Sequence, residues 1–93
     1  MSIAIIGGND RMASRYKQLC EQRKCKAKVF TQLQGIRNQI GQPDLVVIFT
    51  STVSHKMIHT AAAALPTDGP QQVVHCHSSS VSALKKVLDQ YAG

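Results

Sequence analysis

The amino-acid sequence predicts an α/β fold in which four parallel strands alternate with helices. Short apolar runs of strand length are followed by segments whose apolar residues recur with helical spacing, and this alternation occurs four times along the chain. The 93 residues suffice for one small domain with one core, so we expect a single α/β domain over residues 1–93. Because the chain has no Trp, two Phe and two Tyr, that core must be aliphatic.

The first two strand–helix pairs are expected within residues 3–40. A strand over 3–6 ends at Gly7-Gly8, and the helix that starts near residue 10 has an apolar face made of Met12, Tyr16, Leu19 and Cys20. A second strand over 27–31 precedes a weaker helix over 33–40.

The third and fourth pairs are expected within residues 44–91. Residues 44–50 are apolar at consecutive positions, which is typical of a central strand buried on both faces. The next helix is expected over 52–65, ended by Pro66 and a turn at 68–70, and its sheet-facing residues are Ile58, Ala61, Ala62 and Leu65. After a last strand over 72–77, the final helix has an apolar stripe of Val81, Leu84, Val87, Leu88 and Tyr91.

Four such pairs predict a half-Rossmann or truncated flavodoxin-like sheet. Because parallel crossovers are right-handed and the loops are short, the expected strand order is 2-1-3-4. Ligands of such sheets bind beyond the carboxyl ends of the strands, at the switch point between the first and third strands.

Three small polar loops are expected to meet at that switch point, over residues 7–11, 50–55 and 75–80. Helix amino ends there direct backbone N–H groups outward and favour an anion. The candidate ligand-binding residues in these loops are Asn9, Thr52, Ser78, Ser79 and Ser80. The alternative is that these residues only cap helices and form turns.

The charge distribution favours an anionic partner. The chain has 11 Lys and Arg against 5 Asp and Glu, a net charge of +6, and seven of the basic residues lie in its first third: Arg11, Arg15, Lys17, Arg23, Lys24, Lys26 and Lys28. A basic face attracts phosphates, carboxylates or nucleic acid, although a solvated helix surface has the same pattern. We expect weak nucleic-acid binding without sequence preference.

Cysteine usage and hydropathy predict a soluble cytoplasmic protein with no membrane partner. Cys20, Cys25 and Cys76 form neither an even framework nor a C-x-x-C motif, so reduced thiols are expected. No apolar stretch approaches the length of a spanning helix, and the amino terminus does not resemble a signal peptide.

Several motifs of common enzymes are missing from the sequence. There is no G-x-G-x-x-G with an acidic residue at the end of the second strand, no G-K-[ST] and no G-x-S-x-G. NAD and ATP in their usual binding modes are therefore disfavoured. The sequence favours a binding module over an enzyme, and both remain open at this stage.

Four histidines make a metal site worth considering. His55 and His59 are spaced i, i+4 on a helix, and His75 and His77 are spaced i, i+2 on a strand, so each pair shares a face. These spacings fit zinc or haem iron, but no zinc motif accompanies them. His55 is the candidate metal ligand because it begins a helix at the carboxyl edge, whereas His59 is expected on the surface and His75 in the core.

Three elements of the chain carry a family resemblance. They are the strand ending in Gly7-Gly8, residues 44–47 leading to Val53-Ser54-His55, and the serine-rich entry to the last helix over 78–84. This combination resembles the bacterial domain-of-unknown-function family 2325 over nearly the whole chain. The resemblance implies a small Rossmann-like cytoplasmic domain without a settled catalytic role, with which haem binding is associated.

Haem is therefore the first-choice cofactor. It needs an imidazole, an apolar slot and cations for two propionates, for which the chain offers His55, its aliphatic helices, Arg11 and Arg15. Since a four-stranded domain has no room for haem inside, we expect it at a homodimer interface against the alanine run 61–64. The leading hypothesis is a non-enzymatic, homodimeric haem-binding sensor or carrier; the alternatives are a phosphate- or nucleotide-binding domain and a basic module associated with nucleic acid.

Overall fold

The computed structural model describes residues 1–65 and 71–91, in which helices alternate with strands along the chain. The strands are β1 (Ser2–Ile6), β2 (Lys26–Phe30), β3 (Leu45–Phe49) and β4 (Gln72–Cys76). The helices are the 3₁₀ helix η1 (Asp10–Met12) and the α-helices α1 (Ala13–Gln22), α2 (Ile36–Gln39), α3 (His55–Ala64) and α4 (Val81–Tyr91). The predicted α/β fold class is confirmed.

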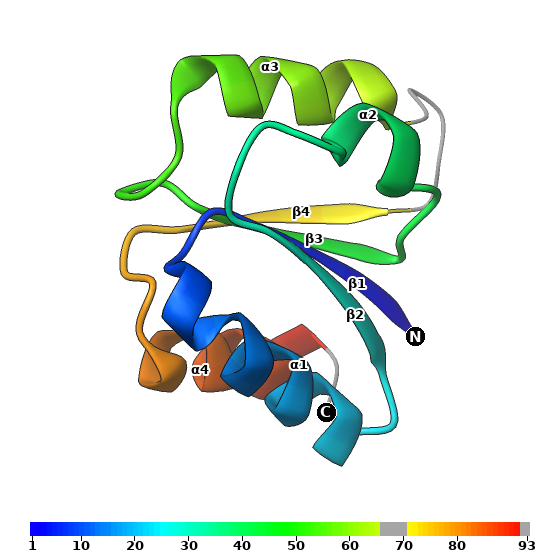
Figure 1. Ribbon diagram of the computed structural model, residues 1–93. Coiled ribbons are helices and arrows are strands. Elements are labelled where there is room, and N and C mark those ends of the chain that lie inside the picture. The colour runs from blue at the N-terminus through cyan, green and yellow to red at the C-terminus, as the bar shows by residue number, and fades with distance from the viewer. Residues whose placement is uncertain (66–70, 92–93) are drawn as a thin grey trace.

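The strands form one all-parallel sheet in the order β2-β1-β3-β4, as predicted. This is the order of the first four strands of a flavodoxin-like sheet. Figure 1 shows α1 and α4 on one face of the sheet and α2 and α3 on the other. Right-handed crossovers explain why α1 and α3 lie on opposite faces, because β1 to β2 and β3 to β4 step in opposite directions across the sheet.

Two apolar clusters hold the layers together, one on each face of the sheet. Alternate residues of β1 belong to the two clusters. Ile3 and Ile5 pack toward α1 and α4, and Ala4 and Ile6 pack toward α2 and α3. Every residue of β3 is buried, so the prediction of a central strand at this position is confirmed. The faces predicted for the first and last helices are also buried or half-buried against the sheet.

The predicted sheet-facing side of α3 is partly wrong. Met57 and Ala61 are its buried residues, while Ala62 is exposed. The helix also begins at His55 rather than residue 52, because Ser54 is its N-cap and its hydroxyl accepts from the Met57 backbone N–H at 3.2 Å. Pro66 and the turn expected at 68–70 lie outside the described residues.

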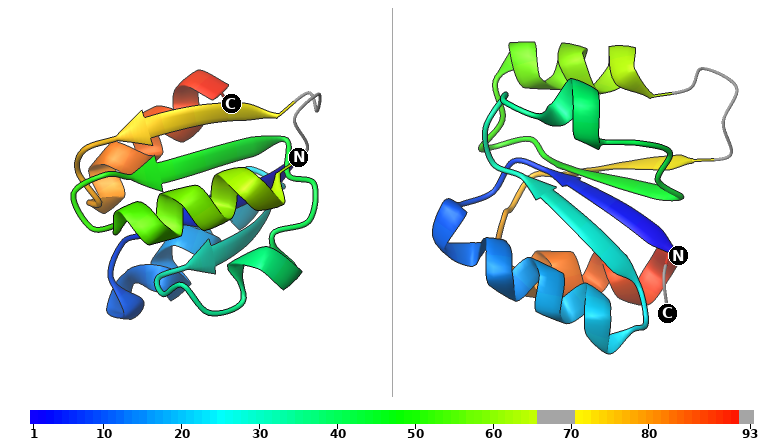
Figure 2. Two further views of the ribbon diagram at one scale, coloured as in Figure 1. Left: turned by 90° about the horizontal axis from the view of Figure 1, so that it is seen from above. Right: turned by 45° about the vertical axis from the view of Figure 1, so that its right-hand side comes forward.

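His75 is exposed rather than buried in the core as expected. It lies on β4, which is an edge strand, opposite Ile48 in the register and therefore on the face that carries α3. Figure 2 shows α3 running over β1 and β3, so β4 lies beside that helix rather than under it. For the same reason Val73 keeps 45% of its surface exposed.

None of the helices in the described part of the chain is long and apolar enough to cross a membrane. The three cysteines are free, and Cys20 and Cys25 are buried between α1 and the sheet.

We expect the Cys20 thiol to make stability fall at alkaline pH. Burial, and to a smaller extent the nearby Cys25 thiol, raises the pKa of Cys20 from 9.0 to about 11. Between these values the unfolded chain has lost a proton that the folded chain retains, so the contribution of this group to the free energy of unfolding is complete below pH 9 and decreases as the pH approaches 11.

Denaturant unfolding across this pH range measures the effect. Cys20→Ala should have a shallower alkaline decline than the unsubstituted chain, because it removes the titrating group. Parallel declines in the two proteins would contradict the prediction.

Candidate functional site

Polar segments that follow β1, β3 and β4 meet at the carboxyl edge of the sheet. The Gly8 backbone N–H donates to Thr52 Oγ1 at 2.7 Å, which joins the first segment to the second. The Tyr16 hydroxyl donates to the Ser79 carbonyl at 2.5 Å, which joins α1 to the third segment. The geometry thus brings together the three loops in which the sequence placed a ligand site.

Two glycines allow this close approach. Gly7 has φ +99° and Gly8 has φ +90°, a region that residues with a Cβ rarely adopt. A Cβ on Gly8 would lie 2.7 Å from the Tyr16 ring, and one on Gly7 would lie 2.5 Å from Val53. The loop after β1 therefore packs directly on α1 and on the segment before α3.

Most of the polar side chains proposed as ligand contacts bind backbone groups instead. Asn9 Oδ1 accepts from the Arg11 N–H at 2.9 Å, and Thr52 Oγ1 donates to the Phe49 carbonyl at 3.1 Å while it accepts from Gly8. Ser80 Oγ accepts from the Ala83 N–H at 3.1 Å and from Ser78 Oγ at 3.1 Å. The Asn9 amide oxygen and the Thr52, Ser78 and Ser80 hydroxyls therefore shape the loops and cap the helices.

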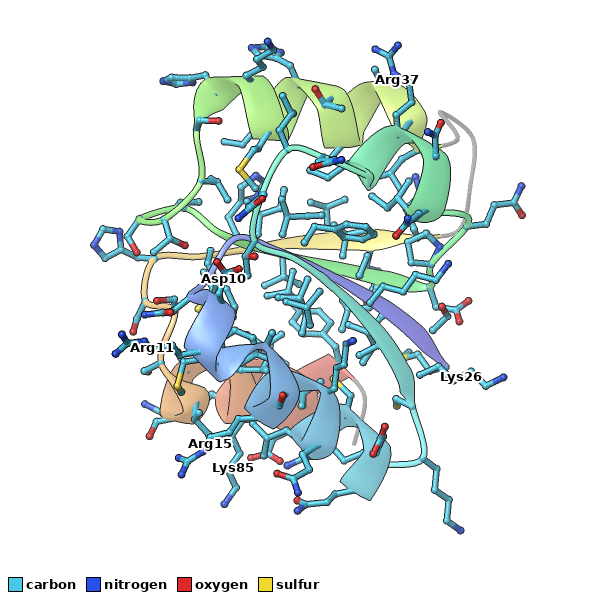
Figure 3. The ribbon with its side chains drawn as sticks, in the orientation of Figure 1. Asp10, Arg11, Arg15, Lys26, Arg37 and Lys85 are labelled. Carbon is cyan, nitrogen blue, oxygen red and sulfur yellow. The ribbon has the colours of Figure 1, made fainter. Side chains whose placement is uncertain are left out.

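Three cations on η1, α1 and α4 have no acidic partner among the described residues. Arg11 comes from η1, Arg15 from the first turn of α1 and Lys85 from α4, and all three are exposed. Figure 3 shows Arg15 and Lys85 projecting from α1 and α4, which pack together on one face of the sheet. Within the described residues none of the three makes an ion pair, whereas Arg23 of the same layer pairs with Asp89. We call Arg11, Arg15 and Lys85 the cation cluster.

His55 occupies the first turn of α3 and is exposed, as is His59 one turn later. It does not lie near the two arginines proposed with it, because α3 and α1 cover opposite faces of the sheet (Figure 1). The described residues contain no group of three His, Cys, Asp or Glu arranged to hold a metal ion. Within one chain, His55 and the two arginines belong to helices on opposite faces of the sheet.

Sequence reasoning missed a pocket of about 560 Å³ at the carboxyl end of β2. Its lining residues are Asp10, Val29, Phe30, Thr31, Gln32, Gln34, Gly35 and Gln39. Asp10 reaches it from η1 and accepts a hydrogen bond from the Thr31 hydroxyl. The second strand itself is followed by Thr31 and Gln32 and has no acidic residue at its end, so the carboxylate here comes from Asp10, after the first strand. The position of Asp10 two residues after Gly7-Gly8 was the available signal.

Comparison with known proteins gives one match. A family model described as "Uncharacterized protein conserved in bacteria (DUF2325)" matches residues 2–91. No curated protein and no solved structure matches the chain.

Replacing Gly8 with Ala should destabilise the fold more than the same change at Gly41. Both glycines have positive φ, but a Cβ at Gly41 meets nothing closer than Lys28 Nζ at 3.7 Å, whereas at Gly8 it meets the fully buried Tyr16 ring. We expect a loss of about 1 kcal/mol for Gly41→Ala from backbone strain, and about 2–4 kcal/mol for Gly8→Ala from strain and overlap together. Denaturant unfolding of both variants tests this prediction. Equal losses in the free energy of unfolding would mean that the Tyr16 ring does not limit the residue at position 8.

Proposed function

The chain belongs to the DUF2325 family of uncharacterized bacterial proteins, and we propose that it is a non-enzymatic module that binds a small phosphate-bearing ligand at the cation cluster. The observation that carries this proposal is the position of Arg11 in η1, just after the carboxyl end of β1 where open α/β sheets bind their ligands, with Arg15 and Lys85 on the adjoining helices α1 and α4.

The chemistry of the cluster suits a phosphate. Guanidinium groups donate paired hydrogen bonds to phosphate oxygens, and a lysine ammonium adds a third positive charge. The backbone N–H groups at the amino end of α4, such as those of Val81 and Ser82, have no acceptor within the helix and lie at the same edge. Because the cations are exposed, we expect modest affinity that decreases with added salt.

A binding role is supported by the hydrogen bonds of the neighbouring hydroxyls. The Thr52 hydroxyl donates to the Phe49 carbonyl and the Ser78 hydroxyl donates to Ser80 Oγ, while Ser80 Oγ caps α4. A nucleophilic or general-base role would require breaking these bonds.

Haem at a homodimer interface is the second candidate, favoured by the exposure of His55 and Val73. His55 offers an accessible imidazole in the first turn of α3, and Val73 leaves 45% of its surface uncovered on the neighbouring edge strand. In this proposal the haem iron binds His55, and Arg11 and Arg15 of a second copy hold the propionates, since those of the same chain lie across the sheet. Dimer formation is thus a requirement of haem binding.

The phosphate proposal is tested by titration with pyrophosphate. Arg15→Gln should weaken binding roughly threefold to tenfold, because it removes a charge-assisted hydrogen bond that is partly screened by water. Arg37→Gln on α2 makes the same change of charge far from the cluster (Figure 3) and should leave affinity unchanged. An equal loss in both variants would mean that pyrophosphate responds to net charge alone.

The haem proposal is tested by absorption spectroscopy and sedimentation with added haemin. The shifted Soret band should disappear in His55→Ala and persist in His59→Ala, and the complex should sediment at about twice the 10.1 kDa mass of the chain. A Soret shift that survives His55→Ala, or a monomeric complex, would contradict this candidate.

A further inference from the structure

The pocket at the end of β2 shares no lining residue with the cation cluster. It is lined by the end of β2, by Asp10 of η1 and by residues between Thr31 and α2. At about 560 Å³ it lies within the usual range for small-molecule sites. Asp10, which lines the pocket, precedes Arg11 of the cluster directly in the chain.

The lining is rich in unused hydrogen-bonding groups. The Asp10 carboxylate accepts one hydrogen bond from Thr31 and has further lone pairs available. The side-chain amides of Gln32, Gln34 and Gln39 make no hydrogen bond to other groups in the described part of the chain, and each offers a donor and an acceptor. The pocket therefore presents one strong acceptor and three groups that can both donate and accept.

This combination suits an uncharged polyhydroxylated ring. Ring hydroxyls can donate to the carboxylate and exchange hydrogen bonds with the amides. A phosphate is disfavoured inside the pocket by the negative charge of Asp10. A cationic group would meet the ammonium of Lys28, which binds the backbone carbonyl of the lining residue Gln39 at 2.7 Å.

We propose that this pocket binds the sugar ring of the same ligand whose phosphate is bound by Arg11 of the cation cluster, so that the ligand is a sugar phosphate or a nucleotide. This inference rests on the proposed function. Asp10 and Arg11 orient the ligand through their opposite charges. The carboxylate of Asp10 lines the pocket and repels a phosphate, while the guanidinium of Arg11 makes no ion pair in the described residues and can bind the phosphate. Adjacent Cα atoms are about 3.8 Å apart, so the two side chains start from neighbouring points of η1.

Calorimetric titration with ribose 5-phosphate and with inorganic phosphate separates the two proposals. We expect ribose 5-phosphate to bind at least roughly tenfold more tightly, the effect of added hydrogen bonds to a charged group. Asp10→Asn should remove most of this advantage and leave the affinity for inorganic phosphate unchanged or slightly raised. The matched control is Asp44→Asn, which makes the same charge change at the amino edge of the sheet, where Asp44 accepts from the Ser2 N–H at 2.8 Å.

A second variant guards against a folding defect in Asp10→Asn. Gln34 is exposed and its side chain has no partner in the described residues, so Gln34→Ala should fold normally and lower ribose 5-phosphate affinity roughly threefold. If ribose 5-phosphate and inorganic phosphate bind equally, and both weaken in Arg15→Gln, the sugar pocket is wrong and the phosphate site stands. If neither binds, both proposals fail.

Discussion

The contact of Tyr16 with the loops at the carboxyl edge is the interaction on which the arrangement of the site depends. The ring is fully buried, lies 5.3 Å from the Phe49 ring and fills the space left by the missing side chain of Gly8, while the hydroxyl donates to the Ser79 carbonyl. One side chain thus fixes the loop after β1, the end of β3 and the entry to α4. Since Arg15 precedes Tyr16 on α1, the same contact sets where the cation cluster lies relative to α4.

The sheet could be predicted from the sequence because burial on both faces leaves a simple pattern. Residues of β1 and β3 are apolar at consecutive positions, and only a central parallel strand demands this. The sequence of the edge strand β4 also predicts a strand, but α3 does not cover the face of β4 that carries His75. His75 is therefore exposed. The face of α3 was misjudged for a related reason: an alanine run has no large residue to define the buried side, and Met57 defines it in the structure.

The candidate site was only partly predictable. The three polar loops were located because strand ends in a parallel sheet share an edge, but the use of their side chains as caps depends on atomic geometry that spacing does not encode. The separation of His55 from Arg11 follows from topology alone. In the order 2-1-3-4, right-handed crossovers after β1 and β3 step in opposite directions and place α1 and α3 on opposite faces.

The charges of η1 show how a basic chain can contain a pocket that disfavours anions. In a 3₁₀ helix successive side chains diverge by about a third of a turn, so adjacent residues face different surroundings. Asp10 therefore turns toward Thr31 and the end of β2, while Arg11 is exposed without an acidic partner among the described residues. The net charge of +6 indicates that the partner carries negative charge. The opposite charges of Asp10 and Arg11 on one short helix determine which chemical group of that partner each side of η1 can bind.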